Sequence, residues 1–403
     1  MIRCDESSGP AGTARDIARR FPMAEDMDAR IAQLRDFFRH DPDNADLACA
    51  LADALCARAD YAAADAVLGG LSVESAVDSG VRFRAARLAL ISGRYEAAEA
   101  GYRQLLASGD DSLAVLHDLA FSQLCLRRLD AAHASIDQAL LRFGREPVLL
   151  ILKARTFAIS GEYDAGIALL DEATTAAPED ASAHGVRALT LFDAGHQDLA
   201  ETAAATALAL DPGQHEALLV AGTQSLWRAE LDLAHARLQE ALRLHPNSGR
   251  ALSGYGQLQM LQRDLPAARV TVENAVRAMP DHIGTWHALA WAQLLQGDQD
   301  AALASYRGAY EVDRNFADTH GGLALISVLR GDHAGAELEL KRAQRLDANS
   351  PTARYAQSLL LQARGDEAGA EALLDGLLQD KAVPAREFAR QLKLRLQSGE
   401  GRR

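Results

Sequence analysis

The most constraining feature of this sequence is a 34-residue period. Four residue registers recur at that spacing, and they stay in step with one another over ten periods. A fixed period of this length is typical of an array in which one supersecondary unit is stacked repeatedly. The registers consist of prolines (Pro178, Pro212, Pro246, Pro280), glycines (Gly93, Gly161, Gly195, Gly297, Gly331, Gly365) and two alanine ladders that include Ala200, Ala234, Ala268 and Ala302, and Ala207, Ala241, Ala275 and Ala309.

Each period has the pattern of two short helices. In residues 283–316, apolar residues such as Trp286 and Leu289 recur at helical spacing. Gly297 can end this first helix, and a second apolar stripe that includes Tyr306 follows it. The eighth position of every unit holds a small residue, which predicts that the paired helices approach closely. The units are expected to begin at residues 45, 79, 113, 147, 181, 215, 249, 283, 317 and 351, and the tenth closes at Pro384.

The same unit carries the residues of a known signature. The pattern W-x2-L-G-x2-Y, followed by A-x3-F and A-x3, falls on Trp286, Leu289, Ala290, Gln293, Ala302, Tyr306 and Ala309. On these residues the chain resembles the tetratricopeptide repeat (TPR) family. The resemblance implies an all-α fold, a right-handed superhelical solenoid of about ten 34-residue helix-turn-helix repeats with terminal capping helices.

The segments outside the array suggest its boundaries. Gly69 and Gly70 lie in the second helix of the first unit, where glycine is unfavourable, so we expect a frayed joint near residues 69–80. The expected organisation is a disordered amino terminus (1–22), a lone helix (23–44), ten TPR units (45–384), a carboxy-terminal capping helix (385–397) and a tail (398–403).

Composition narrows the compartment and the class of partner. The net charge is −14, which argues against nucleic acid as a partner because phosphate contact needs clustered positive charge. No stretch of 18 apolar residues predicts membrane insertion, and the polar amino terminus lacks the apolar core of a signal peptide, so we expect a cytoplasmic protein. The chain holds 38 arginines and 4 lysines and is rich in alanine, which is typical of bacteria with GC-rich genomes.

The sequence offers no catalytic motif. It contains no P-loop, GxGxxG, HExxH, GxSxG or EF-hand pattern, and its 12 histidines are scattered rather than paired at metal-ligand spacing. Four cysteines at no paired spacing do not indicate a zinc site. We therefore expect no enzyme activity, no catalytic residues, no metal and no cofactor. Only 19 residues follow the last unit, so an associated enzyme is expected to be a separate chain.

The resemblance also indicates where a partner would bind. In TPR solenoids the first helix of each unit lines a concave groove, into which its positions 2, 5, 9, 12 and 13 point. Aromatic and arginine side chains at such positions are the strongest candidates, because they dominate interface energetics. We expect a protein or peptide segment that is apolar or basic and carries one acidic group, bridged by Arg87 and Arg155. The candidate contact residues are Phe83, Arg87, Phe121, Ile151, Arg155, Trp227, Trp291 and Tyr355.

Two classes of function remain open. The first is a non-enzymatic scaffold, adaptor or chaperone that holds a partner segment, as in the assembly of bacterial secretion, pilus or exopolysaccharide machinery. The second is a regulatory or substrate-recruiting module of a separate, transferase-type enzyme, or a peptide-sensing regulator. The first is the leading interpretation and the second is the alternative, and the sequence leaves the partner and the oligomeric state open.

Overall fold

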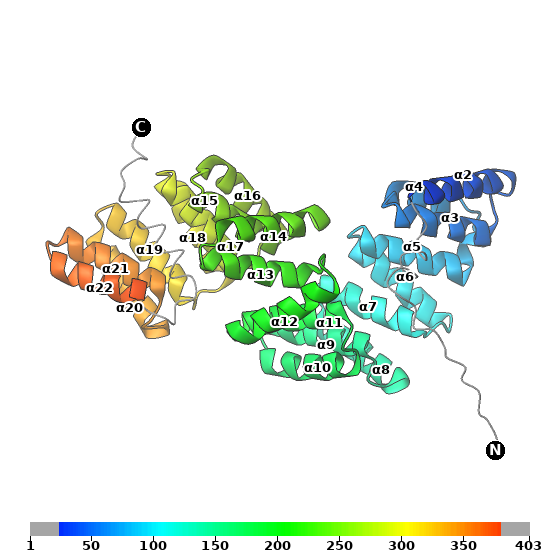
Figure 1. The fold of residues 1–403 in the computed structure, drawn as a ribbon, viewed down its shortest axis with the longest axis horizontal. Helices are drawn as coiled ribbons and strands as arrows, with labels where there is room; N and C mark the ends of the chain where they lie inside the picture. The colour runs from blue at the N-terminus through cyan, green and yellow to red at the C-terminus, as the bar shows by residue number, and fades with distance from the viewer. Residues whose placement is uncertain (1–23, 380–403) are drawn as a thin grey trace, which may run out of the picture. The chain divides into compact units, whose positions relative to one another are not determined.

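A computed structural model of the chain describes residues 24–379 (Figure 1). The chain forms two compact units, an amino-terminal unit that runs to Gly161 and a carboxy-terminal unit that starts at Glu162. Within the described residues every regular element is helical, which confirms the predicted all-α class. The predicted disordered segment 1–22, capping helix 385–397 and tail 398–403 lie outside the described residues.

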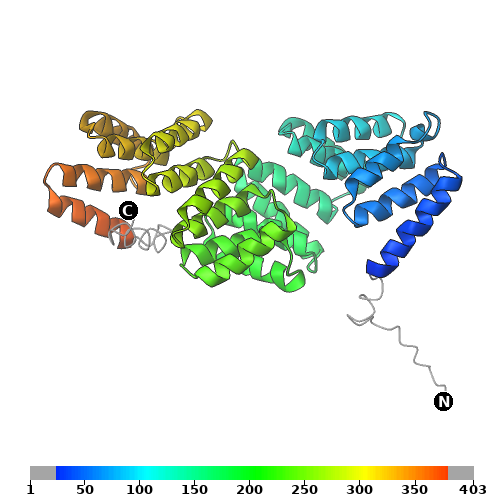
Figure 2. The ribbon, with the colours of Figure 1, turned by 90° about the horizontal axis from the view of Figure 1, so that it is seen from above.

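The amino-terminal unit begins with a single helix that packs on the first repeat, the dark blue helix in Figure 2. Ile31 of this helix is buried in the same apolar cluster as Leu51 and Leu55 of the first repeat. The unit comprises α2 (Ala24–His40), α3 (Ala45–Ala57), α4 (Tyr61–Gly69), the 3-10 turn η1 (Ser75–Val77), α5 (Ser79–Ile91), α6 (Tyr95–Ala107), α7 (Leu113–Cys125), α8 (Leu129–Phe143) and α9 (Pro147–Ser160).

The carboxy-terminal unit continues the alternation of first and second helices, and each first helix from α11 onward packs against the second helix that follows it (Figure 1). It comprises α10 (Tyr163–Ala176), α11 (Ala181–Asp193), α12 (Gln197–Leu210), α13 (His215–Trp227), α14 (Leu231–Leu244), α15 (Gly249–Leu261), α16 (Leu265–Ala278), α17 (Ile283–Leu295), α18 (Gln299–Val312), α19 (Ala317–Leu329), α20 (His333–Leu346), α21 (Pro351–Ala363) and α22 (Glu367–Gln379).

The 34-residue period sets where the helices begin. The first helices of the repeats start at Ala45, Ser79, Leu113 and Pro147, and then at 34-residue intervals to Pro351, which are the positions that the sequence predicts. Prolines open α9 and α21, where the absent N–H is not needed for a helical hydrogen bond. Because each repeat packs mainly on the repeats next to it, the core is a series of small apolar clusters rather than a single central core.

The turn between the two helices of a repeat needs a left-handed residue. Gly93, Gly161 and the other glycines of the sequence register have positive φ, and so do non-glycine residues at the same position of four other repeats. Ala59 and Ala229 adopt φ of 57° and 58°. For a residue with a Cβ this conformation costs about 1–2 kcal/mol. The period, more than the residue type, therefore dictates the shape of the turn. The four residues are Ala59, Arg127, Ala229 and Arg263.

Small residues at the eighth position allow the close helix packing that the sequence predicts. Ala120, Ala188 and Ala290 are fully buried at this position. A Cβ on Gly222 would lie 2.9 Å from Leu238 Cγ, and one on Gly256 would collide with Val272 Cγ2. A larger side chain would therefore separate the two helices of its repeat.

The connector after α4 is held in place rather than frayed. The backbone N–H and the hydroxyl of Ser72 both donate to the Asp43 carboxylate at 2.7 Å, and the hydroxyl of Ser75 donates to the Asp43 carbonyl at 2.9 Å. The sequence identified the irregular backbone, since α4 ends at Gly69 and a 3-10 turn follows. It did not identify Asp43 as the residue that anchors this backbone.

Candidate functional site

The eight predicted contact residues all lie on first helices. Phe83 and Arg87 come from α5, Phe121 from α7, and Ile151 and Arg155 from α9 in the amino-terminal unit. In the carboxy-terminal unit, Trp227 comes from α13, Trp291 from α17 and Tyr355 from α21. Because the two units are compact bodies of their own, each contributes a separate candidate surface.

In the amino-terminal unit, a line of rings and polar groups joins α5 to α7 through α6. The ring of Phe83 meets that of Tyr102 edge-on at 6.0 Å, and the Tyr102 hydroxyl donates to Asp118 Oδ2 at 3.0 Å. Asp118 Oδ1 lies 2.9 Å from His117 Nδ1, and the His117 ring is parallel to that of Phe121 at 6.5 Å. Phe83 and Phe121 are therefore fixed to one framework, which we call the amino-terminal aromatic surface.

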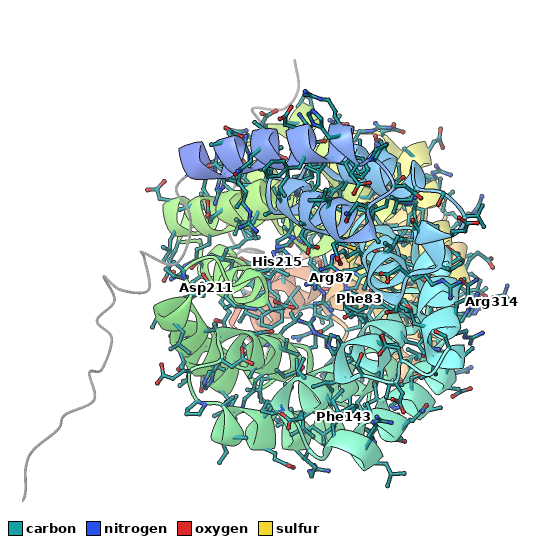
Figure 3. All side chains as sticks on the ribbon, turned by 90° about the vertical axis from the view of Figure 1, so that its right-hand side faces the viewer. Phe83, Arg87, Phe143, Asp211, His215 and Arg314 are labelled. Atoms are coloured by element: carbon teal, nitrogen blue, oxygen red, sulfur yellow. The ribbon has the colours of Figure 1, made fainter. Side chains whose placement is uncertain are left out.

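Arg87 lies one helical turn after Phe83 on the same face of α5, as Figure 3 shows. Its guanidinium is exposed, and its charge opposes the effect of burial and of Asp118, which raise the pKa of Tyr102. Arg155 of α9 is half-buried near Cys125, where burial raises the pKa of the thiol to about 11 while the charge of Arg155 opposes that rise. The predicted bridging of Arg87 and Arg155 by one acidic group stays a proposal.

Ile151 requires a correction. Its side chain is only 6% exposed and packs inside the amino-terminal unit beside Leu150 and Leu152, which are buried as well. The register predicted a groove-facing residue, but α9 is buried on most of its circumference near this point. Ile151 therefore contributes to packing and offers no surface to a partner.

In the carboxy-terminal unit, Trp227 is stacked on another ring. It lies on the last turn of α13, with its ring 5.0 Å from that of Phe192 on α11 and the two planes at 27°. Both side chains are half-buried. The stack joins two adjacent first helices, and each ring keeps part of its surface exposed.

Trp291 and Tyr355 meet although they belong to first helices two repeats apart. Their ring centroids are 5.8 Å apart, with the planes at 46°. Both pack against the apolar cluster of α19 and α21 that contains Leu325 and Leu360. Burial raises the pKa of Tyr355, and the ring is still half-buried rather than enclosed. We call Trp227, Phe192, Trp291 and Tyr355 the carboxy-terminal aromatic surface.

A close approach of α19 and α21 accompanies this contact. A Cβ on Gly321 would lie 2.5 Å from the backbone nitrogen of Ala353, so only glycine permits the observed packing. Gly321 occupies the fifth position of its repeat, where the next repeat carries Tyr355 and the second repeat of the chain carries Phe83. Because Gly321 has no side chain, α19 and α21 are in direct backbone contact at this position.

The sequence missed one charged pair on the same helices. Arg250 of α15 donates two hydrogen bonds, both of 2.8 Å, to the Asp193 carboxylate at the end of α11. Arg250 occupies the second position of its repeat and Asp193 the thirteenth position of its own, and one repeat lies between them. Both positions belong to the groove-facing register, so the sequence marks each residue as groove-facing. It does not show that the two residues pair, because the pair spans an intervening repeat.

The described residues hold no group of three or more histidine, cysteine or acidic side chains able to bind a metal ion. Cys49, Cys56 and Cys125 are free thiols, and burial raises the pKa of each, which disfavours the reactive thiolate. None of the helices in residues 24–379 combines the length and the hydropathy that crossing a bilayer requires.

The family follows from the repeat. A model of the tetratricopeptide repeat matches residues 117–181, 151–215, 228–282 and 287–351, which together make up more than half of the chain. The chain belongs to the tetratricopeptide repeat family. Repeat arrays of this kind generally serve as scaffolds for protein–protein interaction. No curated protein is similar enough in sequence to match this TPR chain.

Solved structures share the fold at low sequence identity. The APC/C hetero-tetramer Cut9–Hcn1 aligns with a TM-score of 0.50 at 14% identity, covering 84% of this chain and 87% of that one. A monomeric mutant of IFIT1 with Gppp-AAAA gives 0.53 at 16%, covering 93% and 95%. The human IFIT1 dimer with m7Gppp-AAAA gives 0.51 at 15%, covering 89% and 95%. At these identities the likeness shows the fold alone.

Proposed function

We propose that this TPR protein is a non-enzymatic scaffold or adaptor that holds a segment of a partner protein on the aromatic surfaces of its first helices. The observation that carries the proposal is the contact between Trp291 and Tyr355. Two large, half-buried rings meet across an intervening repeat and pack against one apolar cluster. Aromatic side chains that are partly fixed in this way lose little entropy on binding, which suits them as anchors.

The chemistry of the surfaces favours a mainly apolar segment. Phe83, Phe121 and Trp227 offer apolar area, and Arg87 offers an exposed cation beside Phe83. A segment with apolar side chains and one acidic group would use both features. The net charge of −14 would repel a strongly acidic partner, and it argues against nucleic acid as well.

The setting of this binding is also a proposal. Assembly of secretion, pilus or exopolysaccharide machinery, or chaperoning of a subunit in the cytoplasm of a bacterium, would require a groove-bound partner segment of this kind. A recruiting module for a separate transferase-type enzyme, or a peptide-sensing regulator, would use the same surfaces, and the identity of the partner would distinguish the cases.

The test compares what the full chain and its variants retain from a cell extract, identified by mass spectrometry. One variant combines Trp291→Ala with Tyr355→Ala. The other is Arg87→Glu, which is not expected to disturb folding because the Arg87 side chain is exposed. Leu199→Ala and Leu338→Ala remove apolar side chains that are each 53% exposed on second helices, and they serve as controls.

We expect one or more proteins to be retained by the parent and both controls and lost from the first-helix variants, with helicity unchanged by circular dichroism. If every retained protein binds the variants as well as the parent, the aromatic surfaces are not the binding site. The parent chain could also retain RNA. If nuclease treatment removes this RNA and releases the bound proteins with it, the proposed class of partner is wrong.

A further inference from the structure

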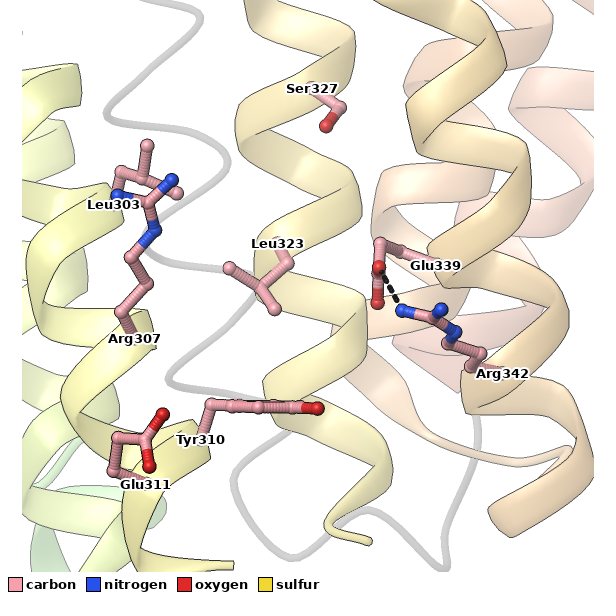
Figure 4. Close-up of a pocket in the computed structure, with 8 residues that line it drawn as sticks. All are labelled: Leu303, Arg307, Tyr310, Glu311, Leu323, Ser327, Glu339 and Arg342. Atoms are coloured by element: carbon pink, nitrogen blue, oxygen red, sulfur yellow. Dashed lines mark hydrogen bonds and ion pairs between the residues drawn. The ribbon is translucent and has the colours of Figure 1, made fainter. Parts of the chain in front are cut away.

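A second site lies away from the aromatic surfaces, in a cavity of 420 Å³ bounded by helices α18, α19 and α20 (Figure 4). Its α19 residues, Leu323 and Ser327, occupy the seventh and eleventh positions of their repeat rather than the groove-facing ones. Figure 4 shows Arg307 on one side of Leu323 and the Glu339–Arg342 pair on the other. The cavity is lined by Leu303, Arg307, Tyr310, Glu311, Leu323, Ser327, Glu339 and Arg342.

The cavity exists because this repeat departs from the one before it at the positions that fill the space. In the preceding repeat, Gln293 on the first helix accepts a 2.7 Å hydrogen bond from Ser305 on the second helix. The same two positions form a 2.8 Å bond between Gln123 and Ser135 in another repeat. In the repeat that begins at Ala317 these positions hold Ser327 and Glu339, and Glu339 bonds His320 of α19 rather than Ser327.

A second pair of positions differs in the same way. The preceding repeat packs the indole of Trp286 over Gly308, whose Cβ would lie 2.8 Å from the ring. The corresponding residues here are His320 and Arg342. The imidazole is smaller than the indole, and Arg342, which replaces the glycine, is one of the residues that line the cavity.

His320 is buried and is fixed through both of its ring nitrogens. Trp286 Nε1 donates to the Pro280 carbonyl at 2.7 Å, and His320 Nε2 reaches the equivalent carbonyl of Arg314 at 2.9 Å. Because a carbonyl oxygen only accepts, Nε2 carries a proton. The other nitrogen, Nδ1, lies 2.6 Å from Glu339 Oε2, and Glu339 Oε1 accepts from Arg342 at 2.6 Å. Both carboxylate oxygens of Glu339 are therefore occupied.

The polar groups that remain without a partner are all able to donate. Glu311 is paired with Arg314 at 3.0 Å, so the second carboxylate of the cavity is engaged as well. Within the described part of the chain, the Arg307 guanidinium, the Tyr310 hydroxyl and the Ser327 hydroxyl have no hydrogen-bond or ion-pair partner. A ligand that satisfies them must bring acceptor atoms, and a negative charge for Arg307.

We propose that the cavity between α18, α19 and α20 binds a carboxylate carried on a short apolar stem, with Arg307 as its cation. Figure 4 shows Ser327 and Tyr310 at opposite ends of the cavity, with the Arg307 guanidinium beside Leu303. Ser327 donates to the same carboxylate as Arg307, and Leu303 and Leu323 contact the stem. A doubly charged phosphate is disfavoured, because Arg307 supplies a single unpaired positive charge, while Arg342 is already paired with Glu339. The carboxylate has two sources in a protein partner, a chain end or an acidic side chain.

The experiment uses the full chain and four probes in ligand-observed NMR titrations. N-acetyl-leucine presents a chain-end carboxylate, the α-amide of N-acetylglutamate presents a side-chain carboxylate, N-acetyl-leucinamide is the uncharged analogue, and inorganic phosphate is the alternative anion. We expect at least one of the two carboxylates to bind with a Kd on the order of 1 mM, as for small fragments, and the better of the two identifies the source.

Three variants connect the binding to the cavity. Arg307→Gln, which changes an exposed side chain, is expected to weaken carboxylate binding at least tenfold. Glu311→Gln removes an opposing charge and is expected to strengthen it about two- to threefold. Arg345→Gln, an exposed residue of α20 outside the cavity, makes the same change in net charge and is expected to leave binding unchanged.

Several results would overturn the proposal. They are the absence of carboxylate binding to the parent chain, equal binding of N-acetyl-leucinamide, binding of phosphate in preference to both carboxylates, and carboxylate binding that Arg307→Gln leaves intact. Because the cavity uses other helices than the aromatic surfaces, none of these results bears on the proposed scaffold function.

Discussion

The indole of Trp291 lies 5.8 Å from the phenol ring of Tyr355, centroid to centroid, although α17 and α21 belong to repeats that are not adjacent in the chain. A repeat array is usually described through contacts between neighbours alone. This pair adds a contact between second neighbours, and the Arg250–Asp193 pair is another in the same unit. Both couple three consecutive first helices, so the carboxy-terminal unit should unfold more cooperatively than an array with nearest-neighbour contacts only.

The first prediction concerns the energy of this ring contact. A double-mutant cycle with Trp291→Ala and Tyr355→Ala is expected to give a coupling energy of about 0.5–1.5 kcal/mol, because an aromatic pair contributes beyond its buried area. Urea denaturation followed by circular dichroism measures it. Trp227 and Tyr355 share no ring contact, so a cycle between them should give additive changes, and a similar coupling there would contradict a direct contact as the cause.

The second prediction concerns the left-handed turn. Ala229→Gly is expected to stabilise the protein by about 0.5–1 kcal/mol, because relief of an αL strain of about 1–2 kcal/mol exceeds the entropy that glycine adds to the unfolded chain. The reverse change at the same register, Gly297→Ala, is expected to destabilise it by about 1 kcal/mol, since Gly297 has φ of 82°. Thermal unfolding measures both changes, and shifts of the same sign would show that the turn is not left-handed in solution.

The third prediction concerns acid stability. Burial lowers the pKa of His287 to about 4, with the charge of His282 adding to the effect and that of Asp318 opposing it. Below its unfolded pKa of about 6.5 the unfolded chain binds a proton that the folded chain does not, so stability falls as pH drops from about 6.5 to about 4. This histidine adds a slope of up to about 1.4 kcal/mol per pH unit.

Denaturation midpoints measured across that range test the assignment. His287→Gln should reduce the slope, whereas His196→Gln, which changes an exposed histidine, should leave it as in the parent. Equal slopes for the parent and both variants would show that folding does not lower the pKa of His287.

The period in the sequence predicts the start of every first helix, because a fixed spacing of small and apolar residues leaves one way to stack the units. It does not predict the partners of Trp291 or Arg250, because contacts that skip a repeat depend on how closely three helices approach. The carboxylate cavity was also invisible, since His320, Ser327, Glu339 and Arg342 look like ordinary variation until their positions are compared with those of the preceding repeat. Ile151 was misassigned because the register gives a direction and not the depth of burial.

The last prediction concerns the glycine that lets α19 and α21 approach. Gly321→Ala would place a Cβ 2.5 Å from the Ala353 backbone nitrogen, and a backbone atom cannot move aside as a flexible side chain can. We expect the substitution to destabilise the protein by about 1–3 kcal/mol, even though alanine is the better helix former. Gly376→Ala is the matched control: among the described residues this helical glycine has only the flexible end of Arg354 nearby, at 3.4 Å, so the propensity gain of about 0.5–1 kcal/mol should make that variant more stable. Because α21 must shift to admit the new Cβ, the Trp291 ring should also lose its contact with Tyr355, which a change in tryptophan fluorescence in Gly321→Ala but not in Gly376→Ala would report. Equal stability gains in the two variants would mean that α19 and α21 lie farther apart than the structure places them.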